Sequence, residues 1–271
     1  MTEAILITGA SSGLGFEMAK WYANHHPERV LVIAGRSKDG LEACRKACQS
    51  LGAQSVIPFI VDLANASERE QLVRDLHAQG LCIGALINNA GGNDAGLYRC
   101  LQPEQVSQIL AINLEACIHL FALLRTDLYQ SSGRVLQISS TGAYQPGPYT
   151  AVYYAAKSFV QSFFEAMMIE EPGIHFCIAR PGALATPFSK RAGKVMVNGS
   201  MSPDQAADII LKAFEHKKRS VTPGLMNKIV IALSKILPRR LLGKLVARIQ
   251  APLQMKKSSS PESAPFEAEQ T

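Results

Sequence analysis

Residues 150–158, TAVYYAAKS, place Tyr153 and Tyr154 side by side, with Lys157 close behind them. In a helix, residues four positions apart lie on one face, which makes Lys157 a neighbour of Tyr153. The residue four positions after Tyr154 is Ser158, which carries no charge. A free tyrosine has a pKa of about 10, too high for efficient proton exchange at neutral pH, and a nearby ammonium group lowers that pKa. The spacing predicts that Tyr153 acts as an acid or base, while Tyr154 packs or lies at an interface.

A glycine-rich segment, TGASSGLG at residues 8–15, follows the apolar run AILIT and precedes a helical pattern. Gly9 permits a tight turn, and Gly13 and Gly15 let the backbone approach a pyrophosphate. The pyrophosphate would rest on the helix N-terminus, where free N–H groups point outward. The segment predicts a dinucleotide site; the alternative is an ordinary turn from strand to helix.

The second apolar run ends in IAGRSKD, where Gly35 occupies the position of the Asp or Glu of an NAD-binding fold and Arg36 follows it. A carboxylate at that position binds the ribose 2′-hydroxyl and repels a 2′-phosphate. A guanidinium instead binds the phosphate through charge-assisted hydrogen bonds. The pattern therefore predicts NADP(H) in preference to NAD(H). The alternative is a solvated surface arginine.

Short apolar runs alternate with helical patterns along most of the chain. The runs are continuous, which indicates strands buried on both faces and paired in parallel through right-handed βαβ units. We expect an α/β fold, a doubly wound Rossmann-type parallel sheet in a single domain with a C-terminal helical extension. Strands are expected at 4–8, 30–34, 55–61, 85–88, 134–138, 175–179 and 220–224. Helices are expected at 13–25, 39–51, 67–79, twice within 103–130, at 150–170 and from 202.

Seven short motifs occur in a fixed order, and with them the chain resembles the short-chain dehydrogenase/reductase family over about residues 3–224. Any single motif can arise by chance, whereas seven in this order are specific for the family. They are TGxxxGxG at 8–15, Asp62 after the third strand, NNAG at 88–91, Asn113 in AINLE, Ser140 in ISS, YxxxK at 153–157 and PGxxxT at 181–186.

The resemblance supplies a second criterion for choosing between the tyrosines. The family places its substrate-orienting serine thirteen residues before the catalytic tyrosine, and this spacing joins Ser140 to Tyr153. The same spacing from Ser139 leads to Val152, which has no hydroxyl group. The serine and the lysine thus select the same tyrosine.

Four catalytic roles follow from the resemblance. Tyr153 would donate a proton to a carbonyl oxygen during reduction or accept one during oxidation. Lys157 would lower the pKa of Tyr153 and bind the nicotinamide ribose. Ser140 would hold the substrate oxygen, and Asn113 would help keep a water-linked proton relay to Lys157. For Asn113, a cap or loop hydrogen bond is the alternative.

The resemblance also implies the residues that contact the cofactor. Asp62 would approach the adenine, with a loop hydrogen bond as the alternative. Residues 89–91 would border the cofactor, and PGALAT at 181–186 would pass the nicotinamide amide. No metal site is expected. The implied set is Thr8, Gly9, Ser11, Ser12, Gly13, Leu14, Gly15, Arg36, Asp62, Leu63, Asn89, Ala90, Gly91, Tyr153, Lys157, Pro181, Gly182 and Thr186.

These features lead us to expect an NADP(H)-dependent oxidoreductase that interconverts a carbonyl and an alcohol, on a lipid-like or acyl substrate. One alternative is a dehydrogenase of a small polar hydroxy compound such as a sugar or hydroxy acid. Another is a non-catalytic NADP-binding regulatory protein, against which the intact Ser140, Tyr153 and Lys157 argue. The segment 187–201 is long enough to form a lid. Its apolar residues suggest an apolar pocket, and its cations either meet an acidic carrier or are solvated.

The basic residues gather near the C-terminus. Net charge is +6, but residues 212–257 hold twelve Lys or Arg and one Glu, a local balance of +11 that leaves −5 for the rest. We divide the chain into a catalytic domain at 1–224, a basic amphipathic helical extension at 225–257 and a disordered polar tail at 258–271. Pro238 should break the extension into two helices. Its apolar and basic rows are Leu241, Leu245 and Ile249, and Arg240, Lys244 and Arg248.

The extension matches the surface of an anionic membrane, with packing on the core or across a subunit interface as the alternative. It lacks the interleaved aromatic residues of a nucleic-acid site, so no nucleic-acid partner is expected. The start, MTEAILITG, has no basic region followed by a long apolar run, and six scattered cysteines show no disulfide framework. We therefore expect a cytoplasmic protein that contacts a membrane if the extension does. The family resemblance implies a homo-oligomer.

Overall fold

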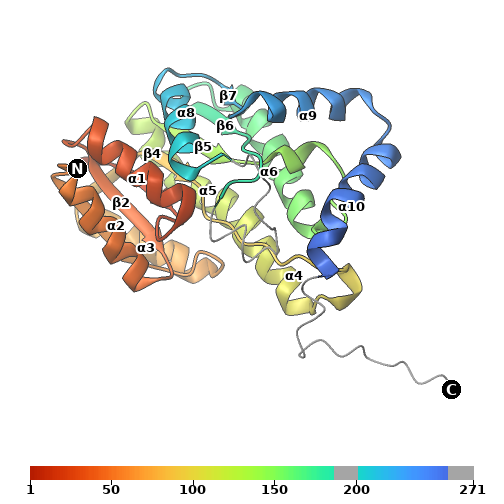
Figure 1. The fold of residues 1–271 in the computed structure, drawn as a ribbon. Helices are drawn as coiled ribbons and strands as arrows, with labels where there is room; N and C mark the ends of the chain where they lie inside the picture. Colours follow the sequence, from red (N-terminus) through yellow and green to blue (C-terminus); the bar gives the residue numbers. More distant parts are fainter. Residues whose placement is uncertain (186–200, 256–271) are drawn as a thin grey trace.

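The computed structural model describes residues 1–185 and 201–255 and contains one parallel sheet flanked by helices (Figure 1). Its strand order is β3-β2-β1-β4-β5-β6-β7, and every pairing is parallel. The order reverses between β1 and β4, the crevice where doubly wound folds bind ligands. The strands are β1 (Thr2–Thr8), β2 (Val30–Gly35), β3 (Ser55–Ile60), β4 (Leu81–Asn88), β5 (Arg134–Ile138), β6 (His175–Ala179) and β7 (Ser220–Val221). The predicted fold class is confirmed.

The helices follow the expected ranges to within a few residues. They are α1 (Gly13–His25), α2 (Lys38–Ser50), α3 (Ala66–Ala78), α4 (Pro103–Leu110), α5 (Ala116–Gln130), α6 (Ala151–Glu170), α8 (Pro203–Glu215), α9 (Leu225–Ile236) and α10 (Arg239–Met255). Shorter turns are η1 (Tyr98–Cys100), the π-helical η2 (Ala111–Glu115) and η3 (Thr141–Tyr144).

Two strands, β4 and β7, differ most in length from the prediction. β4 begins at Leu81 rather than at residue 85, because Gly84 interrupts the apolar run without ending the strand. A side chain at position 84 would meet Glu3 across the sheet, near an irregularity in the β1–β4 register. β7 ends at Val221 and contains only two residues.

Two hydrophobic layers hold the sheet. One contains Met18 of α1 and Phe214 of α8 against one face of the sheet. The other contains Leu72 of α3, Phe121 of α5 and Phe164 of α6 against the opposite face. All eight residues of β4 are buried. The prediction of strands covered on both faces is therefore confirmed, and the helices fix the strand ends from which the site is built.

The helical stretch Pro103–Gln130 is long and apolar enough to cross a membrane by length and composition. Its second half, α5, packs one face against the sheet, with Leu120, Leu124 and Leu128 buried. Core helices of soluble proteins satisfy the same test, so this stretch by itself is weak evidence for a membrane span.

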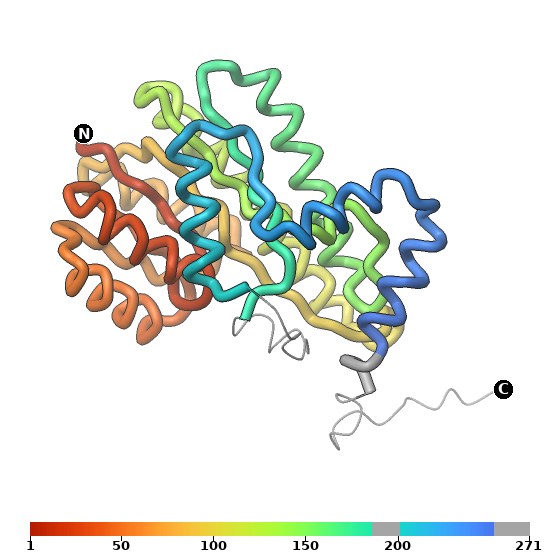
Figure 2. The backbone as a smooth tube through the Cα atoms, turned by 45° about the horizontal axis from the view of Figure 1, so that its top comes forward, coloured from red at the N-terminus to blue at the C-terminus, as the bar shows by residue number. Residues whose placement is uncertain are grey.

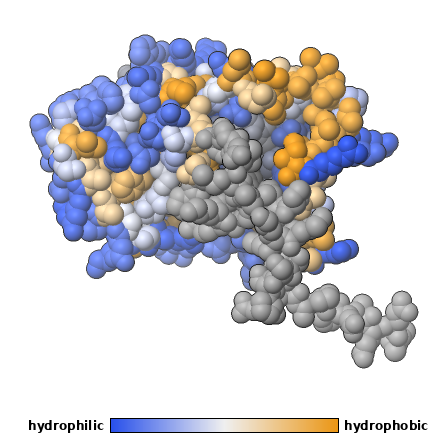
Figure 3. Space-filling view, viewed as in Figure 1, coloured by the Kyte–Doolittle hydropathy of each residue, from blue (hydrophilic) through white to orange (hydrophobic). Residues whose placement is uncertain are grey.

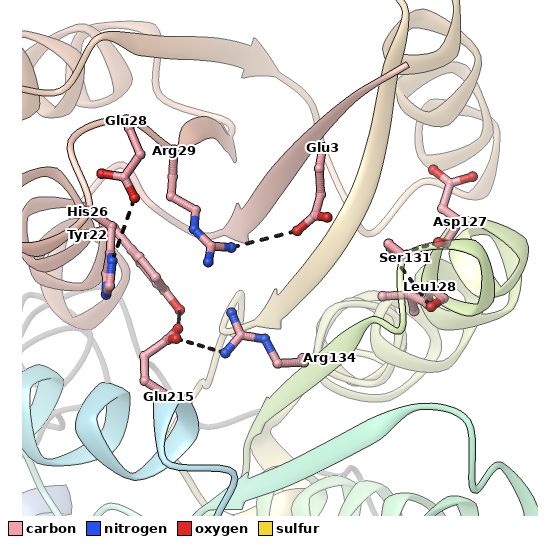
Figure 4. A network of polar contacts seen from close by, with 10 residues as sticks. All are labelled: Glu3, Tyr22, His26, Glu28, Arg29, Asp127, Leu128, Ser131, Arg134 and Glu215. Atoms are coloured by element: carbon pink, nitrogen blue, oxygen red, sulfur yellow. Dashed lines mark hydrogen bonds and ion pairs between the residues drawn. The ribbon is translucent and has the colours of Figure 1, made fainter.

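A polar network ties α1, α8 and β5 together at the sheet end where β5 begins (Figure 4). The Tyr22 hydroxyl donates to one Glu215 oxygen at 2.7 Å, and Arg134 Nη1 donates to the other at 2.8 Å. The Arg134 and Glu215 side chains are only 14% and 19% exposed. Burial opposes ionisation of Glu215, but the hydrogen bonds from Arg134 and Tyr22 hold its pKa below the ordinary value.

We expect Glu215→Gln to lower the free energy of unfolding by about 2 kcal/mol, because it leaves the Arg134 guanidinium largely buried without a counter-charge. The pKa of Glu215 is depressed in the fold, so its contribution is present above the ordinary carboxyl pKa of about 4.3 and is lost as pH falls through the folded value. Urea unfolding from neutral pH to acid measures both effects. Glu28→Gln, at a side chain 62% exposed, is the control; an equal loss in both variants would contradict the expectation.

Candidate active site

The glycine loop between β1 and α1 is closely packed against the loop after β4. Gly9 has φ +68° and Gly13 has φ +61°, a region that glycine adopts without strain. A Cβ at Gly15 would lie 2.5 Å from both the Asn89 Nδ2 and the Gly9 carbonyl oxygen. Ser12 is the N-cap of α1, and its side chain makes no capping hydrogen bond. The loop is thus a cradle at an open helix N-terminus, which fits the pyrophosphate of a dinucleotide.

Thr8 and Asn89 join the two loops. The Thr8 hydroxyl accepts hydrogen bonds from the backbone N–H groups of Asn89 and Ala90 at 2.9 and 3.0 Å. It donates to the Ile87 carbonyl at 3.1 Å, and the Asn89 amide donates to the Thr8 carbonyl at 2.8 Å. The sequence motifs at 8–15 and 88–91 are therefore one structural unit, in which Asn89 holds the glycine loop.

Arg36 and Asp62 lie at the ends of neighbouring strands, β2 and β3. Arg36 is exposed and has no ion-pair partner among residues 1–185 and 201–255, so its guanidinium is available to an anion. One Asp62 carboxylate oxygen accepts from the Ala64 backbone N–H at 3.1 Å, the loop hydrogen bond that was the alternative role. Leu63 is buried, and its carbonyl accepts from Arg69.

Asn113 lies in the π-helical turn η2 and is fully buried. Its amide donates to the Gly92 carbonyl at 2.6 Å and to the Ile109 carbonyl at 2.9 Å. Its Oδ1 is buried without a hydrogen-bond partner within the described ranges. Single π-turns inside helices are frequent at functional sites. Asn113 therefore anchors the loop after NNAG, and its remaining oxygen is free for a water or ligand.

Ser140, Tyr153 and Lys157 meet where β5 ends and α6 passes it. Ser140 lies close enough to the buried Tyr153 to lower the pKa of its hydroxyl. The Lys157 Nζ lies 5.6 Å from the centre of the Tyr153 ring and donates to the Ile138 carbonyl at 3.0 Å. Ser139 instead points its hydroxyl at the Lys157 carbonyl, at 3.5 Å. The structure thus brings Tyr153 together with Lys157 and Ser140.

One electrostatic prediction is not realised in the chain by itself. Burial raises the pKa of Tyr153, the neighbouring Tyr154 adds to the rise, and Ser140 acts in the opposite direction. Burial also lowers the pKa of Lys157. Since the ammonium lies beside the ring and bonds to a carbonyl, it does not offset the desolvation of the phenol. The Tyr153 hydroxyl is therefore held in its protonated form.

Tyr154 binds the C-terminal extension. Its hydroxyl accepts from Gln250 Nε2 of α10 at 2.9 Å, and Gln250 Oε1 accepts from the Thr150 hydroxyl at 3.1 Å. The ring packs beside Gly142, where a Cβ would lie 3.0 Å from it. The predicted packing role is confirmed.

Residues 181–186 are only partly described. The Pro181 carbonyl accepts a hydrogen bond from the Thr141 backbone N–H. A Cβ at Gly182 would collide with the side chain of Asn227 on α9. Leu184 pairs with Met201, so the two ends of the intervening segment lie together. Thr186 and the proposed lid residues Phe188, Lys190, Arg191, Lys194, Val195, Met196 and Val197 lie outside the described residues, as does the polar tail. No group of three His, Cys, Asp or Glu in the described part of the chain could hold a metal ion.

Sequence reasoning missed three residues around the tyrosines. Val246 of α10 and Ile109 of α4 share one hydrophobic cluster with Tyr153 and Tyr154. Gln250 follows Val246 by four positions, on the same buried face of α10. The sequence does carry a signal for Gln250. It is a polar residue in line with Leu242 and Val246, one position away from the row Leu241, Leu245 and Ile249. Asn93, whose amide is buried without a partner in the ranges described, was also missed.

Over residues 3–196 the chain matches a family model described as short chain dehydrogenase. An Arabidopsis thaliana protein named 11-beta-hydroxysteroid dehydrogenase 1A is 26% identical over 233 residues, which cover 83% of this chain and 66% of that protein. A Nostoc sp. protein named ketoacyl reductase HetN is 28% identical over 242 residues, 87% of this chain and 83% of that protein. The similarity therefore includes the site described above and part of the extension.

A solved structure has the same fold over nearly the whole chain. The short-chain dehydrogenase from Sphingobium yanoikuyae in complex with NADPH superposes with a TM-score of 0.77 at 24% identity, covering 98% of this chain and 99% of that one. At this identity the likeness shows the fold alone. It extends beyond the residues of the family model and so includes elements near the C-terminus.

Proposed function

The chain belongs to the short-chain dehydrogenase/reductase family of oxidoreductases, and from this premise we propose that it interconverts a carbonyl and an alcohol with a nicotinamide cofactor. One observation carries the proposal: Tyr153 is buried with Lys157 Nζ 5.6 Å from the centre of its ring and with Ser140 close enough to lower its pKa. The glycine cradle at the N-terminus of α1 supports a dinucleotide at the same edge of the sheet.

Each site residue has a defined part in the proposed reaction. Ser140 holds the substrate oxygen, and Tyr153 gives that oxygen a proton in the reductive direction. Lys157 holds the nicotinamide ribose, and Asn113 keeps the path by which Tyr153 regains its proton. When bound, the cofactor supplies or accepts the hydride. In oxidation the same residues act in reverse.

The cofactor proposed is NADP(H). The exposed Arg36 at the end of β2 supports this choice, because no carboxylate follows the strand directly and a guanidinium can bind the 2′-phosphate.

We expect Arg36→Asp to lower kcat/KM with NADPH by about 10–100-fold and to spare NADH, which matches the loss of one charge-assisted bidentate contact. Steady-state rates with both cofactors measure the ratio. Arg74→Asp reverses the charge of another exposed arginine, 61% exposed on α3, and should leave the ratio unchanged. An unaltered preference in Arg36→Asp would remove the assignment.

The substrate proposed is apolar, of the lipid-like or acyl class. Val246 and Ile109 belong to one hydrophobic cluster with Tyr153 and Tyr154, which supports apolar surroundings near the reacting group. The names of the relatives, a hydroxysteroid dehydrogenase and a ketoacyl reductase, agree with this class. A consumption screen of NADPH over ketones, aldehydes and 3-oxoacyl thioesters of increasing chain length tests it, with the Tyr153→Phe variant as the blank. Turnover confined to small sugars or hydroxy acids would favour the alternative substrate.

We further propose a catalytic domain at 1–224 with an extension at 225–257, working as a cytoplasmic homo-oligomer. The continuous sheet from β1 to β7 supports the first boundary, and the break between α9 and α10 at Pro238 supports the helical pair. Light scattering of the full chain gives the number of subunits. No nucleic-acid partner is proposed.

A further inference from the structure

The outer face of α9 and α10 is apolar and uncovered. Eight large apolar side chains there are 40–80% exposed, and they recur three or four positions apart, so each helix carries one stripe. In Figure 3 they form the apolar area over the two helices. Exposed patches of this kind mark interaction sites. The outer stripe consists of Leu225, Met226, Ile229, Leu233, Ile236, Leu241, Leu245 and Ile249.

Cations surround the outer stripe, and no acid accompanies them. The two helices carry six exposed Lys or Arg side chains through residue 248. The sequence holds no Asp or Glu between Glu215 and Glu262. The partner of this surface must therefore tolerate an unbalanced positive charge. The six cations are Lys228, Lys235, Arg239, Arg240, Lys244 and Arg248.

The inner face of the same helices is fixed to the core. Ile231, Leu242 and Val246 are buried. Figures 1 and 2 show α9 and α10 as two consecutive helices that meet at an angle on one side of the molecule. Since the inner face is packed, the outer stripe is the surface of an ordered element. On the inner side, Val246 shares a hydrophobic cluster with Tyr153 and Tyr154, and Gln250 donates to the Tyr154 hydroxyl.

We propose that the outer stripe docks on an anionic lipid bilayer, and that an apolar ketone or alcohol dissolved in that bilayer reaches Tyr153 past α10. Basic amphipathic helices lie in the interfacial plane with their apolar side chains in the acyl boundary, and anionic headgroups neutralise the cations. A second copy of the chain fits less well, because pairing this face with itself would bring two sets of six cations together without a carboxylate. The substrate part rests on the proposed function, whereas the docking part does not.

Vesicle co-sedimentation of the full chain tests the docking. Ile236→Glu combined with Ile249→Glu places one charge in each half of the outer stripe, at side chains 80% and 70% exposed. Its matched control is Ile169→Glu on α6, also 80% exposed. The probes are phosphatidylcholine vesicles with or without about 30% phosphatidylserine. Circular dichroism and NADPH binding verify that each variant folds.

We expect the wild type and Ile169→Glu to bind the anionic vesicles, and the double variant to bind them about tenfold less tightly or worse. Lys244→Gln with Arg248→Gln should weaken binding by about fivefold for each cation lost. Equal pelleting of all variants, or equal binding to neutral and anionic vesicles, would overturn the docking. The docking would also be overturned if light scattering shows that the wild type is an oligomer and the double variant is not, while both bind vesicles equally. The stripe would then be a subunit interface.

Kinetics separate the substrate claim from the chemistry. The double variant should lose kcat/KM for a long-chain ketone dissolved in anionic vesicles and keep it for a short water-soluble ketone. Equal rates on the vesicle-dissolved ketone would overturn delivery from the bilayer. An absence of turnover on every carbonyl compound would refute the proposed function and the delivery with it, while the sedimentation result would still decide the docking.

Discussion

The Tyr153→Phe variant should lose about 10²–10⁴-fold in kcat/KM or more, because it removes the group that exchanges a proton with the substrate oxygen. The hydroxyl is buried, and its surroundings hold it in the protonated form. Phenylalanine keeps the ring, which belongs to one hydrophobic cluster with Tyr154 and Val246, so the fold should change little. Progress curves of NADPH oxidation with a carbonyl substrate, taken together with a thermal unfolding curve, measure both quantities.

Tyr154→Phe is the matched control, since it removes the same atom from the next residue. It should keep most of the activity but lose about 1–2 kcal/mol of stability, because Gln250 of α10 then has a buried donor without its acceptor. The two variants should therefore dissociate activity from stability. Substantial turnover in Tyr153→Phe, or loss of turnover in Tyr154→Phe without unfolding, would reverse the choice between the tyrosines.

The fold and the pairing of Tyr153 with Lys157 were predictable from the sequence because both depend on short-range spacing. Continuous apolar runs set the strands, and the four-residue interval places Tyr153 and Lys157 on one face of α6. The proline at 238 ended α9 as expected, and α10 starts at Arg239. These are local properties, in which backbone geometry alone decides which residues face each other.

The electrostatics and the role of the extension were not predictable, because both depend on tertiary burial. The sequence shows an ammonium four residues after a phenol, but not that desolvation of Tyr153 outweighs its neighbours. Likewise, Leu245 and Val246 are both apolar in the sequence, and only the packing of α10 leaves the first 40% exposed and the second 6% exposed. The π-turn around Asn113 also has no signal in composition.

Lys157→Met should lower kcat/KM by about 10²–10³-fold and yet raise the free energy of unfolding. Burial lowers the pKa of Lys157, so the folded state penalises its charged form. The penalty is fully present below the folded pKa and disappears as pH rises through the unfolded value of about 10.4, because the unfolded chain binds the proton more tightly. Methionine has a similar length and no charge to desolvate. The stability advantage of the variant should thus be largest at neutral pH and narrow in alkali.

This opposite movement distinguishes a catalytic lysine from a structural one. A lysine retained for its hydrogen bond to the Ile138 carbonyl would lose stability and activity together when replaced. When a lysine retained for its chemistry is replaced, the enzyme loses activity while the free energy of unfolding rises, because the energetic cost of the desolvated ammonium is removed. Lys46→Met, at a side chain 71% exposed on α2, should change neither quantity. Chemical denaturation across pH, combined with turnover measured on the same samples, decides between the two, and a joint loss in Lys157→Met would assign the residue to the fold.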